Sequence, residues 1–217
     1  MNVTVVLSGG VGARFGNELP KQYQSLLDKE VIEYVINAVT AASSNDKSLI
    51  VAAKSDMPRL VNTYKIDCVY AGSTHNASVK NGIDYIKSHM PECKNVMFVD
   101  AARPFIEASI IDSYFRDLEE YDAVITTKRI TDSLGYKNEL YIDRTDYYLI
   151  QKPEAFRFEM LYEIFTCDST VTAIVQQLPN YTKVHKRFIT SHNLKITYPD
   201  DLLLAEFLMK QQTYTSE

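Results

Sequence analysis

The sequence contains little cysteine. Its three cysteines, Cys68, Cys93 and Cys167, lie far apart among 217 residues. An odd number of cysteines at such spacing excludes a disulfide framework, and no pair of them has the spacing of a zinc site. We therefore expect reduced, mostly buried thiols and a cytoplasmic protein.

Long hydrophobic runs are also missing. No apolar run approaches the roughly 18 residues of a membrane span, and the segment after Met1 lacks the basic and apolar regions of a signal peptide. We therefore expect no membrane span and no export signal. Neither the seven glycines nor the seven prolines cluster into a linker. We predict a single domain over residues 1–217, since a chain of this length can bury a full core.

The chain has fewer basic than acidic residues. The chain has 23 Lys and Arg against 28 Asp and Glu, for a net charge of −5. Nucleic-acid binding requires dense positive charge that displaces counterions from phosphates, so this balance argues against a nucleic-acid partner. A small anionic substrate is compatible with it, because a few well-placed cations suffice to bind one.

Short β-branched segments alternate with amphipathic ones along the chain. Mostly apolar segments that predict buried strands occupy residues 3–7, 49–53, 66–70, 96–99 and 123–126. Apolar positions at three- and four-residue spacing predict helices in residues 30–42, 76–87 and 108–118. This alternation predicts an α/β fold with a doubly wound, mostly parallel Rossmann-like sheet. Ligands of such sheets bind beyond the carboxyl ends of the strands.

Residues 127–148 interrupt this pattern. They are polar and rich in tyrosine and charge, with a turn signal at Gly135 and an alternation over Leu140–Arg144 that is typical of an exposed strand or hairpin. A polar hairpin that leaves a sheet often needs a partner to cover its edges. We therefore predict a protruding β-arm over about 127–148 that forms a dimer contact; the alternative is an ordinary solvated loop.

The first predicted strand leads directly into a glycine-rich segment, Ser8-Gly9-Gly10-Val11-Gly12-Ala13-Arg14-Phe15-Gly16. Glycines let the backbone approach a ligand and expose successive N–H groups, which form a nest for phosphate. Arg14 adds a cation suited to a triphosphate, and Lys21 supplies a second one shortly afterwards. A glycine-rich loop alone could be a tight turn, but the two cations favour a phosphate site.

Two further charged residues are associated with predicted strands, Asp100 just after one and Lys195 within another. Asp100 directly follows the strand predicted at 96–99, where a carboxylate can hold Mg²⁺ against nucleotide phosphates or simply cap a turn. Lys195 is predicted to lie on a short strand before a helix that begins near Pro199. The alternative for Lys195 is a solvated side chain on an edge strand.

The segment Ala71–Ser78 follows the third predicted strand and opens a helix. Thr74 or Asn76 could cap that helix. Gly72 and Ser78 are candidates to line the pocket of a nucleotide base.

Taken together, these segments resemble the cytidylyltransferase family that contains 2-C-methyl-D-erythritol 4-phosphate cytidylyltransferase and the ribitol-5-phosphate cytidylyltransferases. The similarity extends from about residue 3 to residue 208. The motifs that carry it are Gly9–Phe15, Leu19–Tyr23, Asp100–Pro104, Asp143-Arg144, Pro153–Phe156 and the Lys195 segment that ends in Pro199-Asp200-Asp201-Leu202.

The resemblance implies a homodimer with interlocked arms, Mg²⁺, and direct attack of a polyol phosphate on CTP. It assigns the catalytic charges to Arg14, Lys21 and Lys195, and the metal to Asp100. It assigns nucleotide binding to Ser8, Gly9, Gly10, Gly12, Gly72 and Ser78. It assigns binding of the second substrate to Arg103, Ser133 and Arg144, the last two reaching from the arm into the neighbouring site.

Four positions depart from the pattern of this family. The chain has His75 where Arg is usual, Val99 where His is common, Lys152 where Thr is frequent, and Thr172 where Asp is usual. With the double glycine of the loop, these differences favour a divergent enzyme for ribitol 5-phosphate or a related capsule or teichoic-acid polyol phosphate. The isoprenoid substrate 2-C-methyl-D-erythritol 4-phosphate is the alternative.

Two other classes of protein compete with this interpretation. A short-chain dehydrogenase is suggested by the glycine spacing and by Tyr148-x-x-x-Lys152, but Pro153 disfavours the helix which that motif requires. In addition, Lys54 follows the second predicted strand where a dinucleotide site has an acidic residue. A CTP-binding relative without catalytic activity is the other alternative, motivated by Thr172 and His75.

Overall fold

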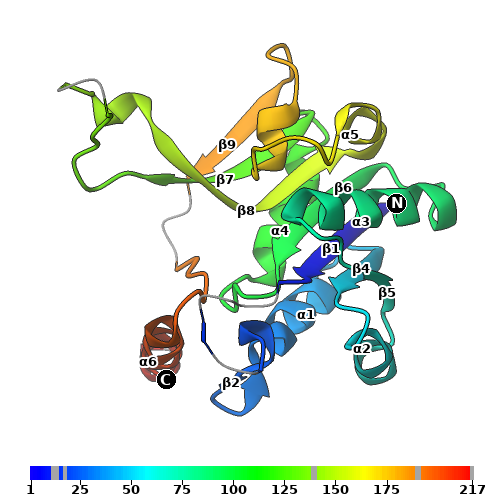
Figure 1. Ribbon diagram of the computed structural model, residues 1–217, viewed down its shortest axis with the longest axis vertical. Coiled ribbons are helices and arrows are strands. Elements are labelled where there is room, and N and C mark those ends of the chain that lie inside the picture. The colour runs from blue at the N-terminus through cyan, green and yellow to red at the C-terminus, as the bar shows by residue number, and fades with distance from the viewer. Residues whose placement is uncertain (11–14, 17–18, 138–140, 189–191, 216–217) are drawn as a thin grey trace.

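A seven-stranded sheet forms the centre of the protein (Figure 1). The computed structural model describes residues 1–10, 15–16, 19–137, 141–188 and 192–215. The strands lie in the order β5 (Asp67–Tyr70), β4 (Lys47–Ala52), β1 (Asn2–Ser8), β6 (Asn95–Asp100), β8 (Tyr148–Arg157), β7 (Ala123–Arg129) and β9 (Val184–Phe188). Only β8 runs antiparallel to its neighbours among these described strands, so the sheet is mostly parallel, as predicted.

Helices cover both faces of this sheet. The α-helices are α1 (Val31–Ala41), α2 (Met57–Tyr64), α3 (His75–His89), α4 (Ala108–Asp117), α5 (Phe158–Ile164) and α6 (Pro199–Thr215). The 3-10 helices are η1 (Lys21–Tyr23), η2 (Arg144–Asp146) and η3 (Ile174–Gln177), and a small hairpin pairs β2 (Ser25–Leu26) with β3 (Lys29–Glu30). The helices predicted from 30–42, 76–87 and 108–118 correspond to α1, α3 and α4 and are confirmed.

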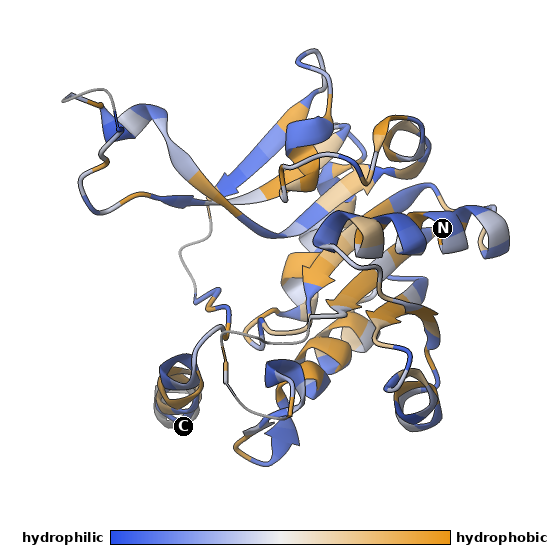
Figure 2. Cartoon of the chain, in the orientation of Figure 1, coloured by the Kyte–Doolittle hydropathy of each residue, from blue (hydrophilic) through white to orange (hydrophobic). Residues whose placement is uncertain are grey.

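The alternation of strand side chains divides the core into two layers. Val6 of β1 packs with α1, α2 and α4, whereas Val5 packs with α3 and α5 on the other face. Successive side chains of a strand point to opposite faces, so both faces of a central strand must be apolar. Figure 2 shows this as hydrophobic strands between helices whose polar faces turn outward.

The strand β8 was not predicted from the sequence. Lys152, Pro153 and Glu154 lie in its middle, and these residues break the apolar pattern by which a buried strand is predicted. In the structure Lys152 and Glu154 are buried and form an ion pair with each other, and the pairing of β7 with β8 shifts register between Ile125 and Thr126. The charge pair and the irregularity make an interior strand look like a loop in the sequence.

The predicted arm begins as an extension of β7 and β8. Thr126–Arg129 pair with Tyr148–Gln151, and this ribbon leaves the sheet at the upper left of Figure 1. The prediction of a strand over Leu140–Arg144 is wrong for residues 141–144, the part of that segment that the structure describes. Tyr141–Asp143 have no regular structure, and Arg144 begins η2. The reason is local: the Asp143 carboxylate accepts hydrogen bonds from the N–H and the hydroxyl of Thr145, at 2.9 and 2.7 Å, and so caps a helical turn.

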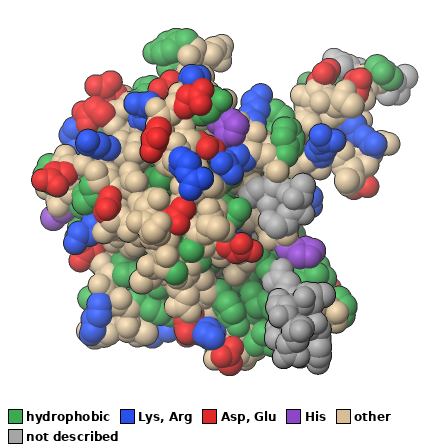
Figure 3. Space-filling view, turned by 180° about the vertical axis from the view of Figure 1, so that it is seen from behind, with side chains coloured by type: hydrophobic (Ala, Val, Ile, Leu, Met, Phe, Trp, Pro, Cys, Tyr) green, Lys and Arg blue, Asp and Glu red, His purple; other side chains and the backbone are tan. Residues whose placement is uncertain are grey.

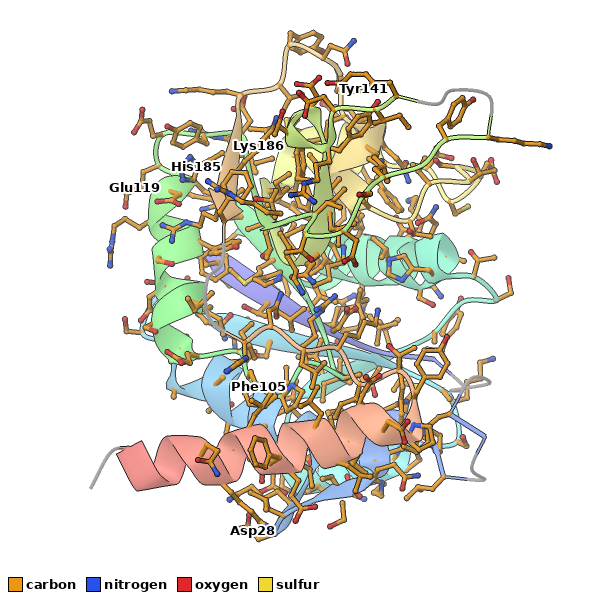
Figure 4. The ribbon with its side chains drawn as sticks, turned by 90° about the vertical axis from the view of Figure 1, so that its left-hand side faces the viewer. Asp28, Phe105, Glu119, Tyr141, His185 and Lys186 are labelled. Atoms are coloured by element: carbon orange, nitrogen blue, oxygen red, sulfur yellow. The ribbon has the colours of Figure 1, made fainter. Side chains whose placement is uncertain are left out.

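The short strand expected at Lys195 is also wrong. Residues 192–197, which we call the strap, lie in neither a strand nor a helix. The strap leads into α6, which lies at the end of the molecule away from the arm (Figure 1). Figure 4 shows the same separation, with Tyr141 on the arm at the top and Phe105 beside α6 at the bottom.

No helix within the described ranges is long and apolar enough to span a membrane. On the face seen in Figure 3, acidic and basic side chains are interspersed over the upper part of the molecule.

Candidate active site

A cavity of about 560 Å³ opens at the carboxyl ends of β1 and β6, beside the N-terminus of α3. This is the edge of the sheet at which the predicted topology placed the ligand. The candidate nucleotide-binding residues that line it are Ser8, Gly9, Gly10, Gly72 and Ser78. The charged candidates that line it are Lys21, Asp100 and Lys195. Gly12 and Arg14 lie outside the described residues.

A glutamine that was not among the predicted site residues fixes the start of the glycine-rich loop. The buried side chain of Gln22 donates through Nε2 to the carbonyl oxygens of Ser8, at 2.8 Å, and Gly10, at 3.1 Å. The Ser8 hydroxyl lies 3.2 Å from the Tyr23 hydroxyl. Gln22 follows Lys21 in η1, so the turn that carries the lysine also holds the loop. Its position in the Leu19–Tyr23 motif was the only sequence signal.

Two glycines allow the close contacts that shape the cavity wall. A Cβ atom at Gly9 would lie 2.2 Å from the Cβ of Ala71, and one at Gly72 would lie 2.4 Å from the Cβ of Ala77. Neither position can hold a side chain without moving the backbone. Among the residues that the structure describes, none would lie within 4 Å of a Cβ at Gly10.

The N-terminus of α3 forms another wall. The Thr74 hydroxyl caps the helix by accepting from the Ala77 N–H at 3.0 Å. Ser78 accepts from the Gly72 N–H at 3.1 Å and donates to the Thr74 carbonyl at 2.9 Å. A capped helix N-terminus that faces a cavity favours negative charge there.

His75, on the first turn of α3, also lines the cavity. Burial lowers the pKa of His75, and the nearby cations of Lys152 and Lys195 lower it further. His75 is therefore neutral at pH 7, and it does not supply the fixed positive charge that an arginine would supply at this position.

Asp100, at the end of β6, is the centre of the charged wall. Its side chain is buried, and its Oδ2 atom lies 3.0 Å from both Arg103 Nε and Lys195 Nζ. Burial alone would raise the pKa of this carboxyl, but the cations of Lys195, Arg103 and Lys152 hold it well below its usual value. Asp100 is therefore ionised throughout the physiological range.

Arg103 has a different environment from the one expected of a substrate ligand. It is buried, it binds Asp100, and its NH1 group donates to the carbonyl of Asn193 at 2.6 Å. It is not among the described residues that line the cavity. In this single chain Arg103 connects Asp100 to the strap.

Lys152 and Glu154 of β8 form a buried ion pair close to this wall. Glu154 also accepts hydrogen bonds from the backbone N–H groups of Ile174, at 3.3 Å, and Val175, at 3.0 Å. The pair thus joins β8 to η3. Since Tyr148 and Lys152 both lie in a strand, they lack the helical arrangement that a short-chain dehydrogenase requires.

The candidate residues of the arm lie outside this cavity. Ser133 and Arg144 are exposed, and Arg144 donates through NH1 to the carbonyl of Thr131. Thr172 is exposed as well, in a loop that Asn76 holds by donating to the carbonyls of Ser169 and Val171 at 2.8 Å each.

The Asp100 carboxylate suits a metal ion whose other ligands come from nucleotide phosphates and water. Within the described ranges, no three His, Cys, Asp or Glu residues gather in a way that could hold an ion. Mg²⁺ in nucleotide sites needs only one or two carboxylates, because phosphates and water complete its coordination. Asp100, ionised and on the cavity wall, fits that requirement.

Glycine-rich backbone, a helix N-terminus and fixed cations at the carboxyl edge of a mostly parallel sheet are typical of one class of protein, the α/β proteins that bind nucleotide phosphates. The family can be named more narrowly. A family model described as 2-C-methyl-D-erythritol 4-phosphate cytidylyltransferase matches residues 2–211, and the chain belongs to this family.

Individual relatives agree with this assignment and show how far the chain has diverged. It is 29% identical to the 2-C-methyl-D-erythritol 4-phosphate cytidylyltransferase of Clostridium acetobutylicum, over 98% of this chain and 99% of that protein. It is 27% identical to the enzyme of the same name from Clostridium botulinum strain 657, with the same coverage. The resemblance to the cytidylyltransferases is therefore confirmed, for a divergent member.

Solved structures share the fold. The crystal structure of 4-diphosphocytidyl-2C-methyl-D-erythritol synthase from Anaerococcus prevotii superposes with a TM-score of 0.81 at 22% identity, covering 96% of this chain and 98% of that one. The 2-C-methyl-D-erythritol 4-phosphate cytidylyltransferase from Thermus thermophilus gives a TM-score of 0.74 at 21% identity, covering 95% and 98%. These likenesses confirm the α/β class and the Rossmann-like arrangement.

Proposed function

We propose that this cytidylyltransferase transfers CMP from CTP to 2-C-methyl-D-erythritol 4-phosphate and releases pyrophosphate. The observation that carries the proposal is the meeting of Lys21, Asp100 and Lys195 on one cavity beside the glycine-rich loop. The choice of acceptor follows the names of the relatives that match along nearly the whole chain. It therefore replaces the ribitol branch as the leading candidate.

The reaction needs positioning and charge more than a nucleophile. A phosphate oxygen of the acceptor attacks the α-phosphorus of CTP, forming a new P–O bond as the bond to the β-phosphate oxygen breaks. Negative charge develops on the α-phosphoryl oxygens and on the departing pyrophosphate. Lys21 and Lys195 stabilise this charge from the cavity wall, because preorganised cations in a partly desolvated site act strongly on it.

Nucleotide binding would use the neighbouring walls. The backbone at Gly9 and Gly10 and the N-terminus of α3 offer N–H groups to the phosphates and base. Asp100 would hold Mg²⁺ together with the phosphates, and the ion would neutralise phosphate charge.

A second acceptor, ribitol 5-phosphate or a related polyol phosphate, is favoured by particular residues of the site. His75 is neutral where the family usually has a cation, and Lys152 adds a buried cation to β8. Thr172 replaces a carboxylate. His75 lines the cavity and Lys152 acts on its pKa, so these two residues change the charge where the second substrate must bind.

The arm supports a homodimer in this proposal. Tyr141, on the arm, is 81% exposed, and Tyr136 is 59% exposed. Large aromatic side chains on a protruding ribbon favour burial against a second copy. In such a dimer Ser133 and Arg144 would bind the acceptor phosphate in the site of the partner.

The test is pyrophosphate release with CTP and Mg²⁺ across an acceptor panel: 2-C-methyl-D-erythritol 4-phosphate, ribitol 5-phosphate and glycerol phosphates. Turnover with the first alone supports the main proposal, and turnover with ribitol 5-phosphate supports the second. CTP binding without release from any acceptor would favour the non-catalytic alternative. Thermal shifts with NAD(H) and NADP(H) should be absent, because only a dehydrogenase gains stability from those ligands.

A further inference from the structure

Lys195 reaches the active-site cavity from a segment without regular structure. The strap, residues 192–197, is neither strand nor helix, yet Lys195 Nζ lies 3.0 Å from Asp100 Oδ2 with the lysine side chain 40% exposed. A lysine side chain has many rotamers, and ordering it costs free energy. The placement of its ammonium group therefore depends on how firmly the strap backbone is held.

Anchoring contacts hold the strap on both sides of Lys195. On the C-terminal side, Ile196 is fully buried and its N–H donates to the Ala102 carbonyl at 2.9 Å. On the other side the anchor is Asn193. Its Nδ2 donates to the Lys152 carbonyl at 2.9 Å and to Gln151 Oε1 at 3.1 Å.

The backbone of Asn193 joins a second network. Its carbonyl accepts from Arg103 NH1 at 2.6 Å, and Arg103 Nε binds Asp100 Oδ2 at 3.0 Å. Asn193 thus ties the strap to β8 through its side chain and to the buried Asp100–Arg103 pair through its main chain. The neighbouring His192 makes a ring contact with Phe105, at 6.1 Å between centroids, and Phe105 lies beside α6 (Figure 4).

We propose that Asn193 is a positioning residue whose side-chain amide holds the strap on β8, so that Lys195 is placed for phosphate transfer. The inference rests on the proposed function, in which Lys195 acts on the reacting phosphates. Both contacts of the amide are donated by one NH₂ group to oxygen acceptors. An aspartate of the same shape cannot donate them and would turn a negative charge toward the Lys152 carbonyl.

A positioning role and a purely structural role predict different couplings to Lys195. If Asn193 acts through Lys195, its removal matters only while the lysine is present. If it supports the fold in general, its removal costs activity in either background. A double-mutant cycle separates the two cases, because residues that act as one unit give non-additive effects.

The experiment compares pyrophosphate release by wild type, Asn193→Ala, Lys195→Ala and the double variant, with kcat and KM for each substrate. We expect Asn193→Ala to lower kcat about 10- to 100-fold, as small misplacements of a catalytic group do, while the KM for CTP changes less than about threefold. In the Lys195→Ala background the same substitution should cost less than about twofold. Asn193→Asp should behave like Asn193→Ala.

Asn81→Ala is the matched control. Asn81 donates through Nδ2 to the Tyr70 carbonyl at 2.9 Å, an amide–carbonyl bond of the same kind at an exposed site, and its loss should leave kcat unchanged. Circular dichroism checks that each variant is folded.

Equal losses in both Lys195 backgrounds, a normal kcat for Asn193→Ala, or unfolding of both Asn193 variants would overturn the positioning role. If wild type itself released no pyrophosphate with any acceptor, the proposed function would fail, and this inference with it. An active wild type with an unaffected Asn193→Ala variant would remove the positioning role alone.

Discussion

Replacement of Asp100 by asparagine tests the electrostatic centre of the site. The substitution keeps the shape of the side chain and removes its charge. Arg103, which is 8% exposed, would then keep a buried positive charge without its counter-ion. Hydrogen bonds to charged groups contribute about 1.5–3 kcal/mol each, and removing one partner of a buried pair costs about 3–5 kcal/mol.

The expected loss of unfolding free energy in Asp100→Asn depends on how exposed the two partners of Asp100, Arg103 and Lys195, are. Lys195 is 40% exposed, so water screens its pair and its loss adds less than about 1 kcal/mol. The amide oxygen of asparagine can still accept one hydrogen bond. We therefore expect the substitution to lower the free energy of unfolding by about 3 kcal/mol in total, mostly because Arg103 loses its counter-ion. For a chain of this size that corresponds to a fall in Tm of about 6–12 °C.

Urea denaturation at pH 7 measures the difference in free energy of unfolding between wild type and Asp100→Asn, and Asp84→Asn provides the control. Asp84 makes an ion pair with Lys80 at the surface of α3, so the same chemical change there should cost less than about 0.5 kcal/mol. Denaturation curves of Asp100→Asn that coincide with those of wild type at pH 7 would refute the reasoning.

The dependence on pH has a definite sign. The pKa of Asp100 is lowered by folding from its usual 3.8, so its contribution to stability is fully present above that pH. The contribution declines as the pH falls below 3.8 toward the folded-state pKa, because the unfolded chain takes up the proton first. The stability gap between wild type and Asp100→Asn should therefore narrow only in acid. A gap that narrows between pH 6 and 8 would point to another group.

Three further substitutions test other parts of the site. Lys21→Ala should lower turnover at least about 100-fold without unfolding the protein, in line with loss of one preorganised charge; a near-normal rate would remove Lys21 from the mechanism. Arg144→Ala should raise the KM for the acceptor phosphate more than that for CTP, and equal losses would contradict the role of the arm. Gly9→Ala should destabilise the fold by about 1–3 kcal/mol, because its Cβ would meet Ala71 at 2.2 Å. Gly10→Ala, whose Cβ would meet no described residue within 4 Å, should keep normal thermal stability, and equal melting temperatures for both glycine variants would refute the packing argument.

The sequence by itself determined the parts of the protein that depend on local pattern. Short apolar segments predicted the parallel strands β1, β4, β5, β6 and β7 but not β9, because burial on both faces of a sheet leaves a continuous apolar run. Helical periodicity predicted α1, α3 and α4. The rule that ligands bind beyond the carboxyl ends of parallel strands then predicted chemistry just after the strands at 3–7 and 96–99, that is, at the glycine-rich loop and at Asp100. Those steps needed only neighbouring residues and the rule that ligands bind at the carboxyl edge.

Only the tertiary structure decided how the site is held together. Asn193 and Lys152 lie 41 positions apart, and Arg103 and Asn193 lie 90 apart, so no local pattern could pair them. The interior strand β8 was missed for a different reason: Lys152 and Glu154 make the segment look polar, yet both are buried there because each compensates the charge of the other. Lys195 likewise gains its position from distant segments that meet only in the folded protein.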